Sequence, residues 1–144
     1  MIAFDTNILV HAHRSDSPFH VRATQLVRES AEGVEPWALL WPCLHEFVAV
    51  VTHPRIFKQP TAMGQALVQV EEWLAAPAVV ALGEVEGYWQ ALTGVAISGH
   101  VAGPKIHDAR IAALAIFHAV DELWSADRDF SRFPGLKVRN PLVS

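Results

Sequence analysis

The acidic residues of the sequence include a set whose type and placement suit divalent-metal chemistry. Each follows a predicted buried strand or begins a predicted helix, and the set is Asp5, Glu46, Asp108, Asp127 and Asp129. Because parallel strands end at one edge of a sheet, we expect the first four of these acids to converge there. Carboxylate oxygens with retained waters are the ligands that Mg²⁺ and Mn²⁺ prefer, and these ions suit phosphoryl substrates. Two such ions about 3.5–4 Å apart could activate a water and stabilise the leaving oxygen of an in-line displacement.

Asp5 carries the most weight because of the residues in front of it. Residues 1–4 are apolar or small and run directly into the acid, which two small polar residues follow. This pattern predicts a buried strand that delivers a carboxylate to its C-terminal end, where open α/β sheets bind ligands. The later acids, taken singly, have ordinary explanations as partners of a helix dipole or as turn residues. The metal hypothesis therefore depends on the combination.

The elements that would position these acids alternate between strand and helix along the chain. The patterning predicts strands over 1–4, 36–41, 78–82, 123–126 and 136–139, and helices over 8–13, 18–33, 43–51, 61–75, 84–97 and 106–120. We expect Ser17 to cap the second helix and the strand over 78–82 to be buried. The helix over 61–75 should present one apolar side, formed by Leu67, Val70 and Leu74. This alternation is typical of an α/β fold with a mainly parallel sheet, and 1–144 is expected to form a single domain.

Composition narrows the class of protein. The formal charge is −4, from 11 Lys+Arg against 15 Asp+Glu, so the surface lacks the overall basic field of a non-specific DNA binder. The chain has a single cysteine, which fits a reducing compartment, and no signal peptide or membrane-length apolar run is evident, so we expect a cytoplasmic protein without a membrane partner. The hydrophobic fraction of 51% leaves apolar surface for a protein partner or a second copy.

Four sequence blocks, taken together and in order, resemble the PIN-domain family, and most closely its VapC-type toxins from bacterial toxin–antitoxin pairs. The blocks are Asp5-Thr6-Asn7, EFVAVVTHPR at 46–55, DARIAALA at 108–115, and SADRDF at 125–130. The resemblance implies a three-layer α/β/α sandwich on a mainly parallel sheet. It also implies an Mg²⁺- or Mn²⁺-dependent endoribonuclease that dimerises and is inhibited by a cognate antitoxin, which inserts a segment near the acidic site.

The resemblance also assigns roles to individual residues. It makes Asp5, Glu46, Asp108 and Asp127 the catalytic acids that bind the metal. Outer residues would orient carboxylates or waters, and these are Thr6, Asn7, Ser125 and Asp129. Serine stands at 125 where the family more usually has threonine, and it keeps the hydroxyl. Basic residues near the motifs either contact RNA phosphates or are ordinary surface charges. The candidates for RNA contact are Arg14, Arg110 and Arg128.

Other chemistries fit the sequence less well. Two histidines spaced as in His11 and His13 point apart on a helix, which disfavours a zinc site. Cys43 is expected to be a buried apolar residue and not a nucleophile. An aspartyl phosphatase would need a second acid at position 7, where Asn7 stands, and no glycine-rich phosphate loop is present.

Two further functions stay open at this stage: a housekeeping PIN nuclease, and a non-catalytic module that only binds a partner. Retention of all four acids disfavours the inactive module, because two carboxylates about 5 Å apart repel by roughly 3 kcal/mol at an effective dielectric of about 20. If the acids converge, at least one should have a raised pKa in the metal-free protein. Asp108→Asn should then raise the melting temperature of the metal-free protein while abolishing cleavage.

Overall fold

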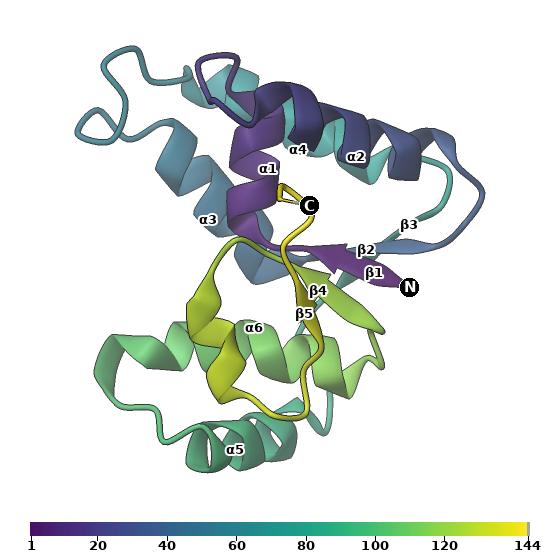
Figure 1. Ribbon diagram of the computed structural model, residues 1–144, viewed down its shortest axis with the longest axis vertical. Helices are drawn as coiled ribbons and strands as arrows, with labels where there is room; N and C mark the ends of the chain where they lie inside the picture. The colour runs from purple at the N-terminus through teal and green to yellow at the C-terminus, as the bar shows by residue number, and fades with distance from the viewer. Residues whose placement is uncertain (144) are drawn as a thin grey trace.

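The computed structural model, which describes residues 1–143, is built on a five-stranded sheet with β1 at its centre. The strand order is β3-β2-β1-β4-β5, and every pairing is parallel. The strands are β1 Ile2–Phe4, β2 Trp37–Leu40, β3 Val79–Leu82, β4 Glu122–Trp124 and β5 Val138–Arg139 (Figure 1). The predicted parallel α/β architecture is therefore confirmed.

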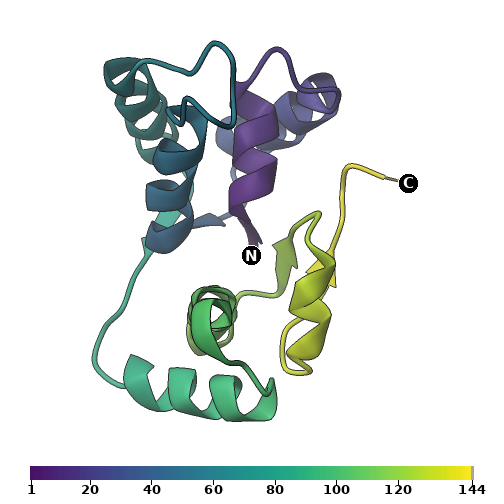
Figure 2. The ribbon, with the colours of Figure 1, turned by 90° about the vertical axis from the view of Figure 1, so that its left-hand side faces the viewer.

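Helices cover both faces of this sheet, and the three layers are visible in Figure 2. One face packs against α1 Thr6–His13, α2 His20–Glu32, α3 Trp41–Val51 and α4 Met63–Leu74. The other face packs against α5 Tyr88–Ser98, α6 Ile106–Phe117 and the short 3₁₀ helix η2 Arg128–Arg132; a second 3₁₀ helix, η1 Gly103–Lys105, leads into α6. No helix among residues 1–143 combines the length and the apolarity that crossing a membrane requires.

Side chains of the central strands alternate between two apolar cores. On β2, Trp37 and Leu39 pack toward α1–α4, whereas Ala38 and Leu40 pack toward α5 and α6. All four are buried, because both faces of the parallel sheet are covered. The runs of apolar residues in the sequence follow directly from this double burial.

Helix α6 places Asp108 beside the sheet. Its first turn carries the acid, and its buried side chains include Ala109, Ala112, Ala113 and Ala115. Alanine side chains are short, so the helix axis can lie close to the strands. Asp108 is thereby held next to the C-terminal edge of the sheet.

The structure corrects two expectations about burial. Strand β3 lies at the edge of the sheet, and Val80 is 37% exposed, so the strand is not fully buried as predicted. Helix α4 buries Ala66 and Trp73, whereas Leu67 is 48% exposed. Val70 and Leu74 pack against the core as expected, so the predicted apolar side of α4 is wrong only for Leu67.

Several helix boundaries also differ from the expected ones. Ser17 does not cap α2: its hydroxyl accepts a hydrogen bond from Phe19 N at 3.1 Å inside a turn, and α2 begins at His20. Pro42 lies in the first turn of α3 and does not separate it from β2. Helix α5 begins only after Gly87, whose φ of 91° is left-handed and interrupts the expected helical run.

Candidate metal centre

The four predicted metal acids line one pocket at the C-terminal edge of the sheet. The pocket has a volume of about 320 Å³, and its polar lining includes Asp5, Thr6, Asn7, Glu46, Asp108 and Asp127. Four different elements supply the acids: the end of β1, α3, α6, and the loop that follows β4. The expected convergence of these residues is thus observed in the fold.

Asp5 is held at the junction of β1 and α1. It is 4% exposed and caps α1, with its Oδ1 accepting a hydrogen bond from Thr6 N at 2.8 Å. Its Oδ2 accepts bonds from Ser125 Oγ at 2.7 Å and from Asn7 Nδ2 at 3.1 Å. The carboxylate therefore has a fixed orientation before any ligand arrives.

Asn7 and Ser125 connect Asp5 to Asp127. Asn7 Nδ2 donates to Ser125 Oγ at 3.1 Å, and Asn7 Oδ1 accepts a bond from Ala126 N at 3.1 Å. The same Ser125 oxygen accepts a bond from Asp127 N at 3.0 Å. This network joins the start of α1 to the loop after β4, and it provides the contacts that an orienting role of both residues would need.

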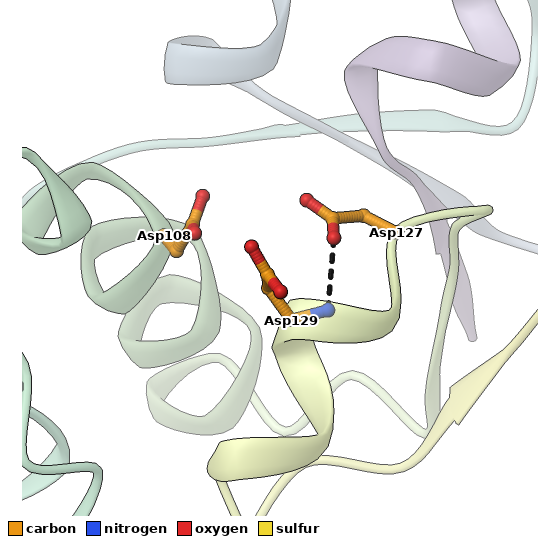
Figure 3. A group of neighbouring side chains, drawn as sticks. All are labelled: Asp108, Asp127 and Asp129. Carbon is orange, nitrogen blue, oxygen red and sulfur yellow. Dashed lines mark hydrogen bonds between the residues drawn. The ribbon is translucent and has the colours of Figure 1, made fainter.

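Asp108 and Asp127 approach each other together with Asp129. One carboxylate oxygen from each lies within 4.8 Å of the others, and Figure 3 shows the three side chains pointing toward one another. Asp127 caps η2, because its Oδ1 accepts a hydrogen bond from Asp129 N at 2.8 Å. Asp129 itself is more exposed, and it forms an ion pair with Lys105.

The electrostatics of the pocket agree with converging acids. Burial raises the pKa of Asp5 above its ordinary value, and the charge of Asp127 adds to this effect, while hydrogen bonds from Ser125 and Thr6 oppose it. Glu46 lies at the exposed mouth of the pocket, where desolvation and then the charge of Asp5 raise its pKa. The expectation that at least one site acid has a raised pKa is therefore confirmed.

A divalent cation fits this set of side chains. Most polar groups that line the pocket offer oxygen ligands, as Mg²⁺ and Mn²⁺ prefer; the exceptions are the amide nitrogen of Asn7 and the imidazole of His11, whose Nδ1 lies 2.6 Å from Ser17 Oγ. Thr6 Oγ1 is buried beside Asp5 and has no hydrogen-bond partner among residues 1–143. The Thr6 side chain also lowers the pKa of the neighbouring Glu46, so its hydroxyl lies among the acids of the pocket.

The histidines and the cysteine do not form a competing site. His11 Nδ1 lies 2.6 Å from Ser17 Oγ, and His13 contacts Gln69 and Thr61, so the two rings have separate partners. Cys43 is fully buried, as expected, but its Sγ also lies 3.6 Å from Asp5 Oδ1, a contact the sequence did not predict. Burial and then the charge of Asp5 raise the pKa of the thiol well above its ordinary range, which opposes a nucleophilic role.

The three arginines considered for RNA binding have different surroundings. Arg14 pairs with Asp16 at 2.6 Å and lies over the ring of Phe57, and Arg110 pairs with Glu84. Neither lines the pocket of the acids. Arg128 is exposed and, with Asp127, lines a neighbouring cavity of about 570 Å³. The structure thus favours structural pairing for Arg14 and Arg110.

Two features of the pocket were not singled out from the sequence. An apolar wall faces the acids, formed by Val10, Val50, Ile56 and Phe57. The other feature, beside the pocket, is the ion pair of Lys105 with the aspartates: the sequence marked Lys105 only as a possible RNA contact, although its position three residues before Asp108 places both on one helical face.

Comparisons with known proteins agree with this geometry. The PIN domain model matches residues 2–136. Ribonuclease VapC48 of Mycobacterium tuberculosis is 37% identical over 138 residues, which are 96% of this chain and 95% of that protein. Ribonuclease VapC43 of the same organism is 39% identical over 142 residues, 99% of this chain and 96% of its own. The chain belongs to the PIN-domain family, and the two relatives named here are VapC ribonucleases.

Solved structures show the same fold. The crystal structure of VapBC2 from Rickettsia felis, bound to a DNA fragment from its promoter, matches with a TM-score of 0.67 at 18% identity, over 96% of this chain and 98% of that one. Mycobacterium tuberculosis VapC20, described as a Sarcin-Ricin loop cleaving toxin, matches with a TM-score of 0.66 at 14% identity, over 91% and 93% of the two chains. The predicted PIN-like sandwich is therefore confirmed.

Proposed function

We propose that this protein is an Mg²⁺- or Mn²⁺-dependent endoribonuclease and the toxin of a toxin–antitoxin pair. The observation that carries the proposal is the convergence of four acids from separate elements on one pocket, beside the unpartnered Thr6 Oγ1. The ribonuclease names of the VapC relatives support the reaction class. The VapBC complexes among the structural neighbours support the antitoxin partner.

In this proposal Asp5, Glu46, Asp108 and Asp127 hold the ion, and Asn7, Ser125 and Thr6 orient their oxygens. A bound divalent ion supplies Lewis acidity and lowers the pKa of a coordinated water, the nucleophile of the hydrolysis. Asp5 and Asp127 are fixed in advance through the Ser125 hydroxyl, so little rearrangement is needed on binding.

The proposed substrate is single-stranded or looped RNA. The apolar wall opposite the acids includes Ile56, which is 54% exposed, and Phe57, so an unstacked base has a surface to lie against while its phosphate meets the acids. Proteins read RNA mainly through such unpaired, splayed bases.

An RNA-cleaving toxin and its antitoxin would meet in the cytoplasm, which is the proposed location. A reading frame for a small DNA-binding protein directly upstream would separate this toxin from a housekeeping nuclease.

The test is cleavage of structured RNAs by purified, partner-free protein in Mg²⁺ or Mn²⁺, with and without EDTA. We expect Asp5→Asn and Asp108→Asn each to lower the cleavage rate by more than about 100-fold, because each removes a proposed metal ligand. Loss of a residue that only hydrogen-bonds to a metal ligand already lowers metal affinity or activity by about 10–100-fold. Glu32→Gln is the control, since this exposed acid ends α2 outside the pocket. Absence of both cleavage and divalent-ion binding would instead favour a non-catalytic module that binds a partner.

A further inference from the structure

Lys105 is the cation that contacts the aspartates of the metal centre. Among the ion pairs of residues 1–143, its Nζ is the partner of both Asp129 and Asp108, with 3.5 Å between Lys105 Nζ and Asp108 Oδ2. The lysine side chain is 42% exposed. A positive charge therefore already lies against two of the three clustered carboxylates.

The position of this ammonium group is set by two elements. Lys105 ends η1 and directly precedes α6, so it shares a helical face with Asp108 three residues later. Asp129 reaches the same ammonium from η2 on the other side. The lysine thus bridges α6 and η2 across the edge of the cluster.

The acids divide into two groups around this lysine. Asp108 and Asp127 line the pocket together with Asp5 and Glu46, whereas Asp129 does not. Yet oxygens of Asp108, Asp127 and Asp129 lie within 4.8 Å of one another, close enough to share a cation. Among residues 1–143, Asp108, Asp127 and Asp129 form the group that is already this close, and the lysine ammonium contacts this outer position. Asp5 and Glu46 line the pocket with Asp108 and Asp127 and would complete a second, inner position around a bound ion.

We propose that Lys105 takes the place of a second divalent cation, so that this protein binds one Mg²⁺ or Mn²⁺ ion. The ion is held by Asp5, Glu46, Asp108 and Asp127, and Asp129 is the anchor of Lys105 and not a metal ligand. Lys105 and Asp129 are positioning residues in this arrangement. The inference rests on the metal centre of the proposed function and settles how many ions that centre takes.

The test is a Mn²⁺ titration of the intact protein, followed through the paramagnetic resonance signal of the free ion. We expect one bound ion in the wild type and two in Lys105→Met, because removing the ammonium vacates the outer position. Lys137→Met is the matched control: Lys137 is 74% exposed and pairs with Glu122 at 3.2 Å, away from the cluster, so its loss should leave one ion. The double variant Lys105→Met/Asp129→Asn should return to one ion, since the outer position then lacks a carboxylate.

The melting temperature provides a second measurement. Without metal, Lys105→Met should melt below the wild type, because the aspartates lose their counter-ion, and saturating Mn²⁺ should remove the difference. Equal ion counts in the wild type and Lys105→Met, whether one or two, would overturn the role of Lys105 while leaving the metal centre intact. No bound ion in either protein would overturn the metal centre as well.

Discussion

At the scale of single residues, the Ser125 hydroxyl connects two parts of the proposed metal centre. Its oxygen donates to Asp5 and accepts bonds from Asn7 Nδ2 and Asp127 N. These three contacts link the Asp5 carboxylate to the backbone of Asp127. Serine and threonine both offer this oxygen, so the departure from the more usual threonine preserves the network.

We therefore expect Ser125→Ala to weaken Mn²⁺ binding and RNA cleavage by about 10–100-fold, the usual cost of losing an orienting partner. Ser125→Thr should retain most of both, because it restores the hydroxyl. Calorimetric Mn²⁺ titration and cleavage rates measured on the same preparations check this. Equal losses in the two variants would show that packing at position 125, and not its hydroxyl, is what matters.

The raised pKa of Glu46 predicts how the metal-free protein responds to pH. A carboxyl whose pKa is higher in the folded than in the unfolded state favours folding when protonated, and this contribution is lost as pH rises through the folded-state pKa. Glu46→Gln should therefore melt above the wild type at neutral pH, and the gain should fade as pH falls toward the ordinary value of 4.5. Melting curves in EDTA across this range measure it.

The gain is expected to be larger for Glu46→Gln than for Asp108→Asn. Lys105 lies 3.5 Å from Asp108 and offsets its repulsion, whereas Glu46 forms no ion pair within residues 1–143. Glu32→Gln again provides the matched control, with no pH-dependent gain expected. A Glu46→Gln variant whose advantage grows as pH falls would contradict the sign of the pKa shift.

At the scale of elements, helix α5 supports the helix that carries Asp108. It packs along α6, and its start depends on Gly87, whose φ is 91°. A Cβ added at this glycine would lie 3.3 Å from Phe117 Cε2, at the far end of α6. Both the backbone conformation and the neighbouring ring therefore favour glycine at this position.

Gly87→Ala should lower the free energy of unfolding by about 1–2 kcal/mol, the usual cost of a left-handed conformation in a residue with a Cβ. For a chain of this size that corresponds to roughly 3–7 °C in melting temperature. Gly64→Ala is the matched control, because it lies in α4 with nothing within 4 Å of the added Cβ. It should stabilise by about 0.5–1 kcal/mol. Denaturant unfolding of both variants gives the comparison, and equal effects would argue against strain at Gly87.

At the scale of the whole molecule, exposed apolar side chains collect on and beside α5. Trp89 is 69% exposed and Ile97 is 70% exposed, and both lie on α5. Val85 shortly precedes this helix, and Phe117 at the end of α6 lies beside Gly87, the residue just before α5. Soluble proteins seldom leave such side chains grouped in water without a partner. We propose that this surface is the interface of the homodimer that the family resemblance implies.

We accordingly expect the purified protein to sediment as a dimer, and Trp89→Glu/Ile97→Glu to sediment as a monomer, because two buried charges would oppose association. Val21→Glu is the control: Val21 is 82% exposed on α2, on the opposite side of the sheet, and its substitution should leave the dimer intact. Sedimentation velocity distinguishes the species. A dimer that survives the double substitution would place the interface elsewhere.

The sequence by itself determined the parallel α/β fold and the four acids that meet. Both follow from local physics: apolar runs such as residues 1–4 form strands buried on both faces, and the ends of parallel strands necessarily share one edge. Asp5 stood out from the other acids because it directly follows a buried strand, but the sequence alone did not show that it also caps α1.

Only the tertiary structure decided which side chains contact the acids and which surfaces are covered. The contacts of Ser125 with Asp5 and of Lys105 with Asp129 join residues distant in the chain, and no local pattern specifies them. The edge position of β3 and the inward side of α4 likewise depend on how the layers pack, because Leu67 is apolar whether or not another element covers it. Hydrophobicity fixes what can be buried, whereas packing geometry selects what is buried.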